Sequence, residues 1–183
     1  MSSQYGVIIV DMQPNFLFDP RHNSPNYKSP RIDLIKGQGE LLTRCIAQDI
    51  PVAVLEFGEG RTISLLRKFV DTTPQHEYFP KHSLDGFYHT DLDRGLREQD
   101  ITHPVMVGVS AGACVMATTE SAIDRSYHPV TAQTLIGHAI LSQEKETHRE
   151  WYRQNTQCYE HHEDLFGLLE KGSPPLAAME GVV

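Results

Sequence analysis

The stretch that decides the fold is PVMVGVSAGACVMATTESAIDRSY, residues 104–127. It begins with an apolar run over residues 105–107, followed by a glycine, and this pattern predicts a short buried strand. Four small residues follow at 110–113, and residues 114–126 favour a helix with one apolar face. The pattern therefore predicts that Cys114 lies where a strand passes into a helix.

A cysteine at such a junction is well placed for nucleophilic chemistry. Unpaired backbone N–H groups and the positive end of the helix dipole stabilise a thiolate there. The small side chains at 110–113 leave room for a substrate carbonyl to reach both the sulfur and those N–H groups. The alternative is that Cys114 only fills space beside the strand, because free cysteine is among the most buried residue types.

The composition indicates a globular protein of one domain. With 183 residues, 39% hydrophobic and 22% charged, the chain fits a single domain over 1–172 and a tail of small residues and prolines over 173–183. The net charge of -8 argues against nucleic-acid binding. No stretch has the length of a membrane helix or the pattern of a targeting peptide. Three widely spaced cysteines give no disulfide framework, so we expect a reduced, cytoplasmic protein.

Strands and helices alternate along the chain. Strand-forming runs are found at residues 5–10, 51–57, 75–81, 129–136 and around Cys158. Helical patterns are found at residues 33–48, 62–71, 91–99, 142–154 and 164–171. Residues 14–30 contain four prolines and are expected to form a long loop. This order predicts an α/β fold, a three-layer α/β/α sandwich with a mostly parallel central sheet.

Two charged residues stand at the ends of predicted strands. Asp11 follows the first strand, and Lys81 ends the third. Ligands of open α/β sheets bind at the carboxyl ends of the strands, so Asp11, Lys81 and Cys114 are candidates for one site. Each also has a simpler interpretation, since Asp11 would cap the following turn and Lys81 would be a solvated surface lysine.

Three motifs resemble those of the isochorismatase-like cysteine hydrolases. They are IIVDMQPNF (8–16), KHSLDGFYHTDL (81–92) and VGVSAGACVMATTESAIDRSY (107–127), and they stand in the order and spacing of that family. The resemblance covers roughly residues 5–137. It implies the family's Rossmann-like topology and a catalytic triad of Asp11, Lys81 and Cys114.

The resemblance also implies a mechanism. Cys114 would attack the substrate and form a thioester, Asp11 would transfer protons, and Lys81 would hold Asp11 ionised and support the thiolate. The backbone N–H groups of Ala111 and Cys114 would form the oxyanion hole, with a cis peptide bond between Ser110 and Ala111. Lys81 and the helix N-terminus would bring the pKa of Cys114 to about 6.

The chain departs from the nicotinamidase-like relatives in one segment. Those relatives bind a metal through an Asp-x-His pair after the second strand, where this chain reads Leu55-Glu56-Phe57-Gly58-Glu59. We therefore expect no metal and no other cofactor. Isochorismatases proper, which hydrolyse a vinyl ether, generally lack the nucleophilic cysteine. What remains is a metal-free, cysteine-dependent hydrolase of a small amide, carbamoyl or related C–N bond.

Two alternatives stay open. Relatives more often carry Thr and bulkier or acidic residues where this chain has Ala111-Gly112-Ala113. That difference would fit a non-catalytic relative that binds a small molecule or serves as a subunit of an assembly. The other alternative is a metal-dependent, nicotinamidase-like amidase.

Four further residues are candidates for the substrate pocket by their position, namely Phe16, Glu56, Phe87 and Ser110. Apart from Ser110, each would serve equally well in packing. Relatives commonly form dimers to octamers, so a homo-oligomer is expected, and its partner is expected to be a small-molecule substrate rather than a nucleic acid or a membrane.

Overall fold

The computed structural model describes residues 5–18, 25–138 and 146–170, and within them a seven-stranded sheet forms the centre of the fold. Every strand pairing in it is parallel, in the order β3-β2-β1-β4-β5-β7, with β6 beside β4. The strands are β1 (Tyr5–Val10), β2 (Val52–Phe57), β3 (His76–Lys81), β4 (His103–Val109), β5 (Val130–Ala132), β6 (Ile136–Gly137) and β7 (Gln157–Tyr159).

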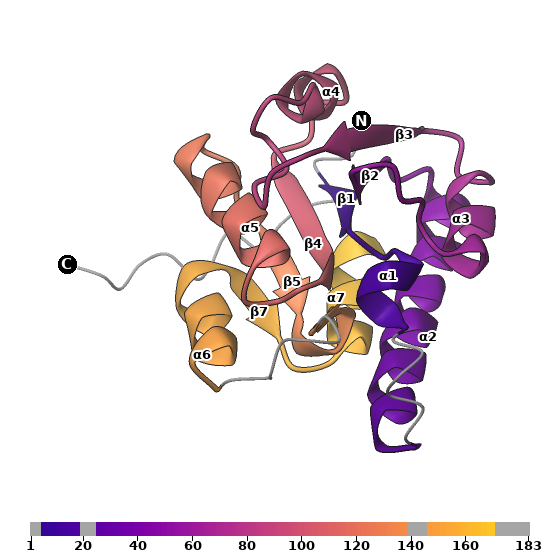
Figure 1. Ribbon diagram of the computed structural model, residues 1–183. Coiled ribbons are helices and arrows are strands. Elements are labelled where there is room, and N and C mark those ends of the chain that lie inside the picture. Colours follow the sequence, from indigo (N-terminus) through magenta and orange to yellow (C-terminus); the bar gives the residue numbers. More distant parts are fainter. Residues whose placement is uncertain (1–4, 19–24, 139–145, 171–183) are drawn as a thin grey trace.

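The helices cover both faces of this sheet (Figure 1). Helices α2, α3 and α7 share one buried apolar cluster with the sheet, and α4, α5 and α6 share another on the opposite face. Their bounds are α1 (Pro14–Leu17), α2 (Pro25–Gln48), α3 (Ser64–Val70), α4 (Leu92–Glu98), α5 (Cys114–Asp124), α6 (Glu146–Asn155) and α7 (His162–Glu170). The predicted three-layer α/β/α sandwich is confirmed.

Strand β1 shows why the sheet is buried on both faces. Val7 and Ile9 belong to the cluster under α2, α3 and α7, whereas Ile8 and Val10 belong to the other cluster. Successive side chains of a strand point to opposite faces, so a continuous apolar run fits a strand covered by helices on both sides. The sequence of β1 therefore dictates a central strand.

Two predicted elements differ from the structure. Residues 14–30 contain α1 and the start of α2. Proline at a first helical position loses no hydrogen bond and already has the helical φ, as at Pro14. The strand predicted over 129–136 is split into β5, a short 3₁₀ helix η1 (Gln133–Leu135) and β6. The tail expected over 173–183 lies outside the described residues.

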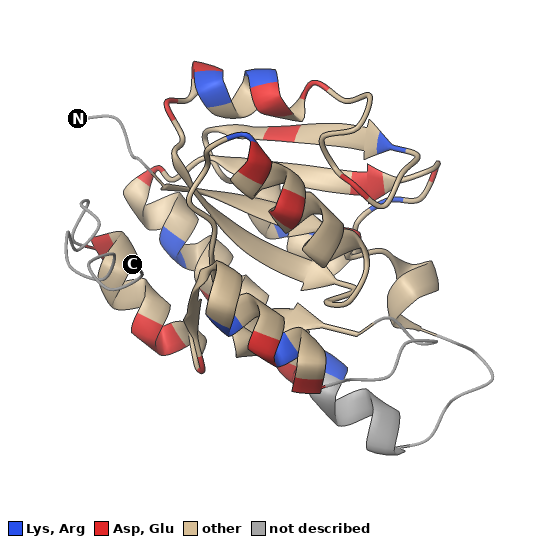
Figure 2. Ribbon diagram, turned by 90° about the vertical axis from the view of Figure 1, so that its left-hand side faces the viewer, with Lys and Arg blue, Asp and Glu red and all other residues tan. Residues whose placement is uncertain are grey.

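Charged residues of both signs are spread over the outer helices and the loops (Figure 2). None of the described helices is both long enough and apolar enough to cross a membrane.

The carboxyl ends of β1 and β4 approach each other closely. Val10 pairs with Gly108, whose φ is +126°. A Cβ at position 108 would overlap the backbone carbonyl of Val10, which cannot move aside as the end of a side chain can. Glycine is therefore required at this point of the sheet, two residues before the turn that leads into α5.

We predict that Gly108→Ala lowers the free energy of unfolding by more than about 4 kcal/mol, because it combines the backbone overlap with an unfavourable φ. Gly58→Ala is the matched control, since Gly58 has a φ of +64° but no atom within 4 Å of its added Cβ. The control should lose only about 1–2 kcal/mol. Urea unfolding of both variants measures the difference, and equal losses would contradict the close approach of the two strands.

Candidate active site

Cys114 is the first residue of α5, directly after the turn of residues 110–113. Its side chain is buried, with the residue 8% exposed. The turn is closed by backbone hydrogen bonds, as the N–H groups of Ala113 and Val115 both donate to the carbonyl of Ser110, at 3.0 and 3.2 Å. The structure thus places Cys114 at the strand-to-helix junction that the sequence predicts.

Asp11 and Lys81 form a buried ion pair at the same edge of the sheet. Lys81 Nζ lies 2.9 Å from Asp11 Oδ2, and the two side chains are 0% and 1% exposed. Asp11 follows β1, where a φ of +52° turns the chain, and Lys81 is the last residue of β3. Lys81 also donates to the backbone carbonyl of Ser83 at 2.9 Å. Parallel pairing through β2 brings the two charges together.

The thiol of Cys114 interacts with both members of this ion pair. Burial raises the pKa of Cys114 to about 11, and the negative charge of Asp11 acts in the same direction, while Lys81 lowers it. The expected pKa of about 6 is therefore wrong for the resting site. Sequence reasoning counted the ammonium and the helix N-terminus, but it missed the desolvation of a buried thiol next to a carboxylate.

Asp11 has the properties of a general base. Burial raises its pKa above the ordinary 3.8, and Lys81 acts against that rise. A hydrogen bond with the thiol of Cys114 also acts against the rise. A carboxylate with a raised pKa that already contacts the thiol is a better acceptor of its proton than a solvated one. The site therefore places a protonated thiol beside a carboxyl group of raised pKa.

The backbone of the turn differs from the expectation at one residue. The cis peptide bond lies between Val109 and Ser110, one residue earlier than expected. The N–H of Ala111 donates to the carbonyl of Gly137 at 2.7 Å, so this group is already engaged and does not serve as an oxyanion donor here. Cys114 is the first residue of α5, so its N–H has no partner within the helix and remains the candidate donor.

The four candidate pocket residues have different surroundings. Phe16 is partly buried and packs edge to face on Phe57, with 6.1 Å between ring centroids. Ser110 is buried in the nucleophile turn itself. Glu56 accepts hydrogen bonds from Thr62 N (2.7 Å) and Arg67 (3.0 Å), which commits it to α3.

Phe87, the fourth candidate, packs in the core rather than at an open wall. It is buried and stacks on Tyr127, with 6.0 Å between ring centroids. The loop that carries it is tied to α5, because Asp85 accepts a hydrogen bond from Ser121 and Gly86 donates to Thr118. Asp85 and Gly86 thus fix the loop after Lys81 onto α5.

Sequence reasoning missed two residues beside the ion pair. The ring centroid of Phe57 lies 4.9 Å from Lys81 Nζ. Gln13 is buried and holds the backbone of Phe57 from both sides, accepting from its N–H at 2.7 Å and donating to its carbonyl at 3.1 Å. Their sequence positions could have indicated both residues, because Phe57 ends the buried strand β2 and Gln13 closely follows the buried strand β1.

Within residues 5–18, 25–138 and 146–170, no three His, Cys, Asp or Glu side chains are grouped so that they could hold a metal ion. His162, in the histidine-rich segment near the C-terminus, contacts Thr134 at 2.9 Å and Glu40 at 3.1 Å.

A sequence model of the Isochorismatase domain matches residues 5–159, from the first strand to the last. The chain belongs to the isochorismatase family. The resemblance found in the three motifs is thereby confirmed, and the family's hydrolase fold extends beyond them to β5, α6 and β7. None of the curated protein sequences matches this chain.

Several solved structures share the fold. N-carbamoylsarcosine amidase from Thermoplasma acidophilum is 16% identical, with a TM-score of 0.69 over 85% of this chain and 94% of its own. The nicotinamidase SaPncA from Staphylococcus aureus is 18% identical, with a TM-score of 0.70 over 86% and 98%. An isochorismatase-like hydrolase from Alkaliphilus metalliredigens is 19% identical, with a TM-score of 0.71 over 92% and 99%. At these identities the likeness establishes the fold.

The raised pKa of Cys114 predicts slow alkylation at neutral pH. At pH 7.5 iodoacetamide should modify Cys114 at least about tenfold more slowly than a free cysteine, because little thiolate is present. Asp11→Asn removes the negative charge and should lower the pKa of Cys114, so the variant should react faster at the same pH. The measurement is the modification rate from pH 6 to 10, followed by peptide mass spectrometry.

Two other cysteines serve as internal controls. Cys45 is fully buried, and burial raises its pKa to about 12, so it should react only when the protein unfolds. Cys158 is half-buried and should react at a rate unaffected by Asp11→Asn. A wild-type Cys114 that titrates at or below the pKa of a free thiol would contradict the described electrostatics.

Proposed function

We propose that this protein is a cysteine hydrolase that cleaves a small-molecule amide, carbamoyl or related C–N bond through a thioester. The observation that carries the proposal is the meeting of a buried Lys81–Asp11 ion pair with a thiol at the first residue of a helix. The names of two structural neighbours, an N-carbamoylsarcosine amidase and a nicotinamidase, support a C–N bond as the target.

The first half of the reaction forms the thioester. The sulfur of Cys114 attacks the substrate carbonyl carbon while its proton passes to Asp11. The oxyanion of the tetrahedral intermediate accepts a hydrogen bond from the backbone N–H of Cys114. Asp11 then returns the proton to the leaving nitrogen, the C–N bond breaks, and an amine or ammonia departs.

The second half restores the enzyme. A water molecule attacks the thioester carbonyl, and Asp11 accepts one of its protons. The same backbone donor binds the second oxyanion, the C–S bond breaks, and the proton reaches the sulfur of Cys114. The products are the amine and the carboxylic acid, and Asp11 ends the cycle as a carboxylate paired with Lys81.

The raised pKa decides the order of events in the first step. With a pKa of about 11, forming a free thiolate at pH 7 would cost about 5 kcal/mol before any bond formed. Transfer of the proton to the neighbouring carboxylate during the attack avoids that separate step. Lys81 stabilises the ionised form of Asp11, which lets the buried carboxyl act as a base at neutral pH.

The first test is a panel of small amides and carbamoyl compounds, with release of ammonia or amine as the readout. Cys114→Ala should reduce turnover by about 10³-fold or more, because it removes the nucleophile. Cys158→Ala is the matched control and should retain wild-type turnover. Hydrolysis that survives in Cys114→Ala would refute the thioester mechanism.

A panel on which the wild type shows no turnover would instead favour the non-catalytic alternative, especially if one panel compound binds. Turnover that disappears on treatment with a chelator and returns with a divalent metal would favour the metal-dependent amidase. Trapping the acylated Cys114 peptide by acid quench and mass spectrometry would support the proposed route directly.

The pH profile tests the role of Asp11. The base must be ionised in the free enzyme, so kcat/KM should fall as the pH drops through the pKa of Asp11. Burial raises that pKa, so the acid limb should lie above the ordinary carboxyl value of 3.8. Lys81→Met removes the ammonium group that lowers the pKa of Asp11, so the acid limb of kcat/KM should move further toward neutral pH. An acid limb at the same pH in both proteins would contradict the proposed coupling.

A further inference from the structure

Helix α6 packs against the turn of residues 110–113 that carries the nucleophile. Tyr152 of this helix is completely buried, and its hydroxyl donates to the backbone carbonyl of Ala111 at 2.7 Å. Burial raises the pKa of the Tyr152 hydroxyl, so it stays protonated and remains a donor at any physiological pH. The acceptor lies three residues before Cys114.

The peptide groups on both sides of Ala111 are therefore fixed by segments that follow α5. The N–H is held by Gly137 at the end of β6, and the carbonyl is held by Tyr152 of α6. Ala111 lies in the third motif, whereas neither Gly137 nor Tyr152 lies in any of the three motifs. The conformation of the turn before Cys114 thus depends on elements from the last third of the described chain.

His148 makes a second contact from the same helix. Its imidazole ring fills the space that a Cβ at position 112 would occupy, so a larger residue at 112 would require this ring to move. The ring stacks on His138, with 5.6 Å between centroids and 25° between planes. Its Nδ1 is buried and has no hydrogen-bond partner among the described residues, so packing is what holds the ring in place.

This contact accounts for the unusual Ala111-Gly112-Ala113 segment. The bulkier or acidic side chain that the family resemblance leads one to expect at this turn is absent, and a histidine from α6 fills the space instead. The small residues of this segment are therefore packed against α6.

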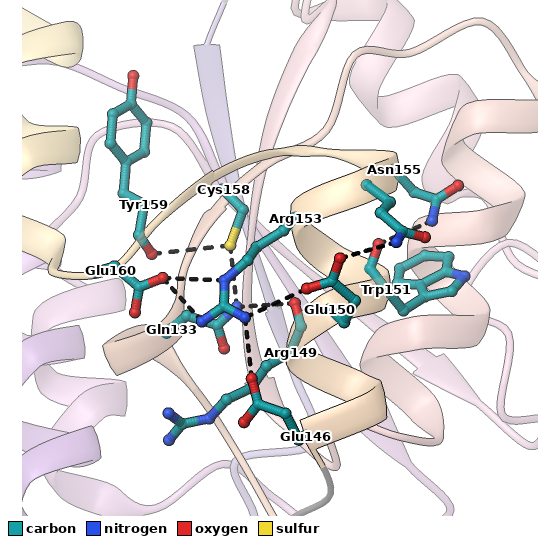
Figure 3. Close-up of polar contacts among 11 residues, drawn as sticks. Gln133, Glu146, Arg149, Glu150, Trp151, Arg153, Asn155, Cys158, Tyr159 and Glu160 are labelled. Carbon is teal, nitrogen blue, oxygen red and sulfur yellow. Dashed lines mark hydrogen bonds and ion pairs between the residues drawn. The ribbon is translucent and has the colours of Figure 1, made fainter.

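Helix α6 is itself fixed to the sheet, as Figure 3 shows. Arg153 lies at the centre of an ion-pair network with Glu146 and Glu150 on the same helix and Glu160 just after β7. Gln133 of η1 donates to the sulfur of Cys158 in β7 at 3.1 Å and to the backbone carbonyl of Arg149 in α6 at 3.3 Å. A contact made by α6 is thus a contact with an anchored element.

We propose that Tyr152 is a positioning residue for Cys114, acting through its hydrogen bond to the turn. His148 supports the same turn by packing on Gly112. Together they hold the 110–113 turn so that the sulfur stays against Asp11 and Lys81. The benefit of this arrangement rests on the proposed hydrolase function, but the positioning itself can be measured without a substrate.

The experiment compares how strongly Asp11 influences Cys114 with and without the Tyr152 hydroxyl. The full chain is alkylated with iodoacetamide at pH 8 in four forms: wild type, Asp11→Asn, Tyr152→Phe and the double variant. In the wild-type background Asp11→Asn should speed the reaction by about tenfold, since it removes a neighbouring negative charge. In the Tyr152→Phe background the acceleration caused by Asp11→Asn should be at least about threefold smaller. The reason is that Asp11 and the Cys114 sulfur influence each other only while they remain in contact.

A merely structural Tyr152 would lower the melting temperature without altering this coupling. Tyr159→Phe is the matched control, because it removes a hydroxyl in β7 that contacts Gln157 and not the nucleophile turn. An effect of Asp11→Asn that is equal in the wild-type and Tyr152→Phe backgrounds would overturn the proposal.

A second pair of variants keeps the proposal testable if Tyr152→Phe does not fold. Gly112→Ala should change the alkylation rate of Cys114 by about tenfold or more, because the new methyl group displaces the turn. Adding His148→Ala makes room for that methyl group and should bring the rate back to within about threefold of the wild type. The exposed Thr147→Ala on the same helix should give no such rescue. If the alkylation rate of Cys114 in the double variant is as far from wild type as in Gly112→Ala alone, the proposed role of His148 is overturned.

The two proposals fail in different ways. If a substrate is found, Tyr152→Phe should lower kcat by about tenfold and leave KM within about twofold, as expected for a displaced nucleophile. Retained hydrolysis in Cys114→Ala would refute the proposed function. The effect of Tyr152→Phe on the response of Cys114 alkylation to Asp11→Asn would still decide whether α6 positions the turn.

Discussion

The buried ion pair between Lys81 and Asp11 is the interaction on which the site depends. Two charges at 0% and 1% exposure are tolerable only because they lie 2.9 Å apart. Removing one partner of such a pair leaves an unpaired buried charge, which costs about 3–5 kcal/mol. The pair in turn requires β3, β2 and β1 to lie in parallel register, since only then do the residues that end β1 and β3 meet. The geometry of the site is therefore set by the topology of the sheet.

The same burial that makes the ion pair strong also determines the protonation state of the Cys114 thiol. A thiol in these surroundings keeps its proton, with a pKa of about 11. In the proposed reaction the thiol therefore gives its proton to Asp11 during the attack, and the raised pKa of that carboxyl fits this role. A protonated resting cysteine also resists oxidation and chance alkylation, because the thiolate is the reactive form.

The nucleophile turn joins the two halves of the chain. Its sequence lies in the third family motif, yet its peptide groups are held by Gly137 and Tyr152, and its glycine accommodates His148. The part of the chain after residue 130, in which the motifs give little guidance, thus supports the part in which they give most. Variation in α6 is a physical route by which a member of this family can retain its motifs and still alter its site.

Local sequence determined the layers of the fold and the three central site residues, because apolar runs, helical periodicity and charged residues at strand ends are read over a few neighbouring positions. The run over residues 5–10 required a doubly covered strand, and Asp11, Lys81 and Cys114 stand where that logic places them. Tertiary structure alone decided the pKa of Cys114, the engagement of Ala111, the commitment of Glu56 to Arg67 and the fit of His148 on Gly112. Each of these depends on contacts between residues far apart in the chain and on how much water they exclude, and neither quantity is written in a local pattern.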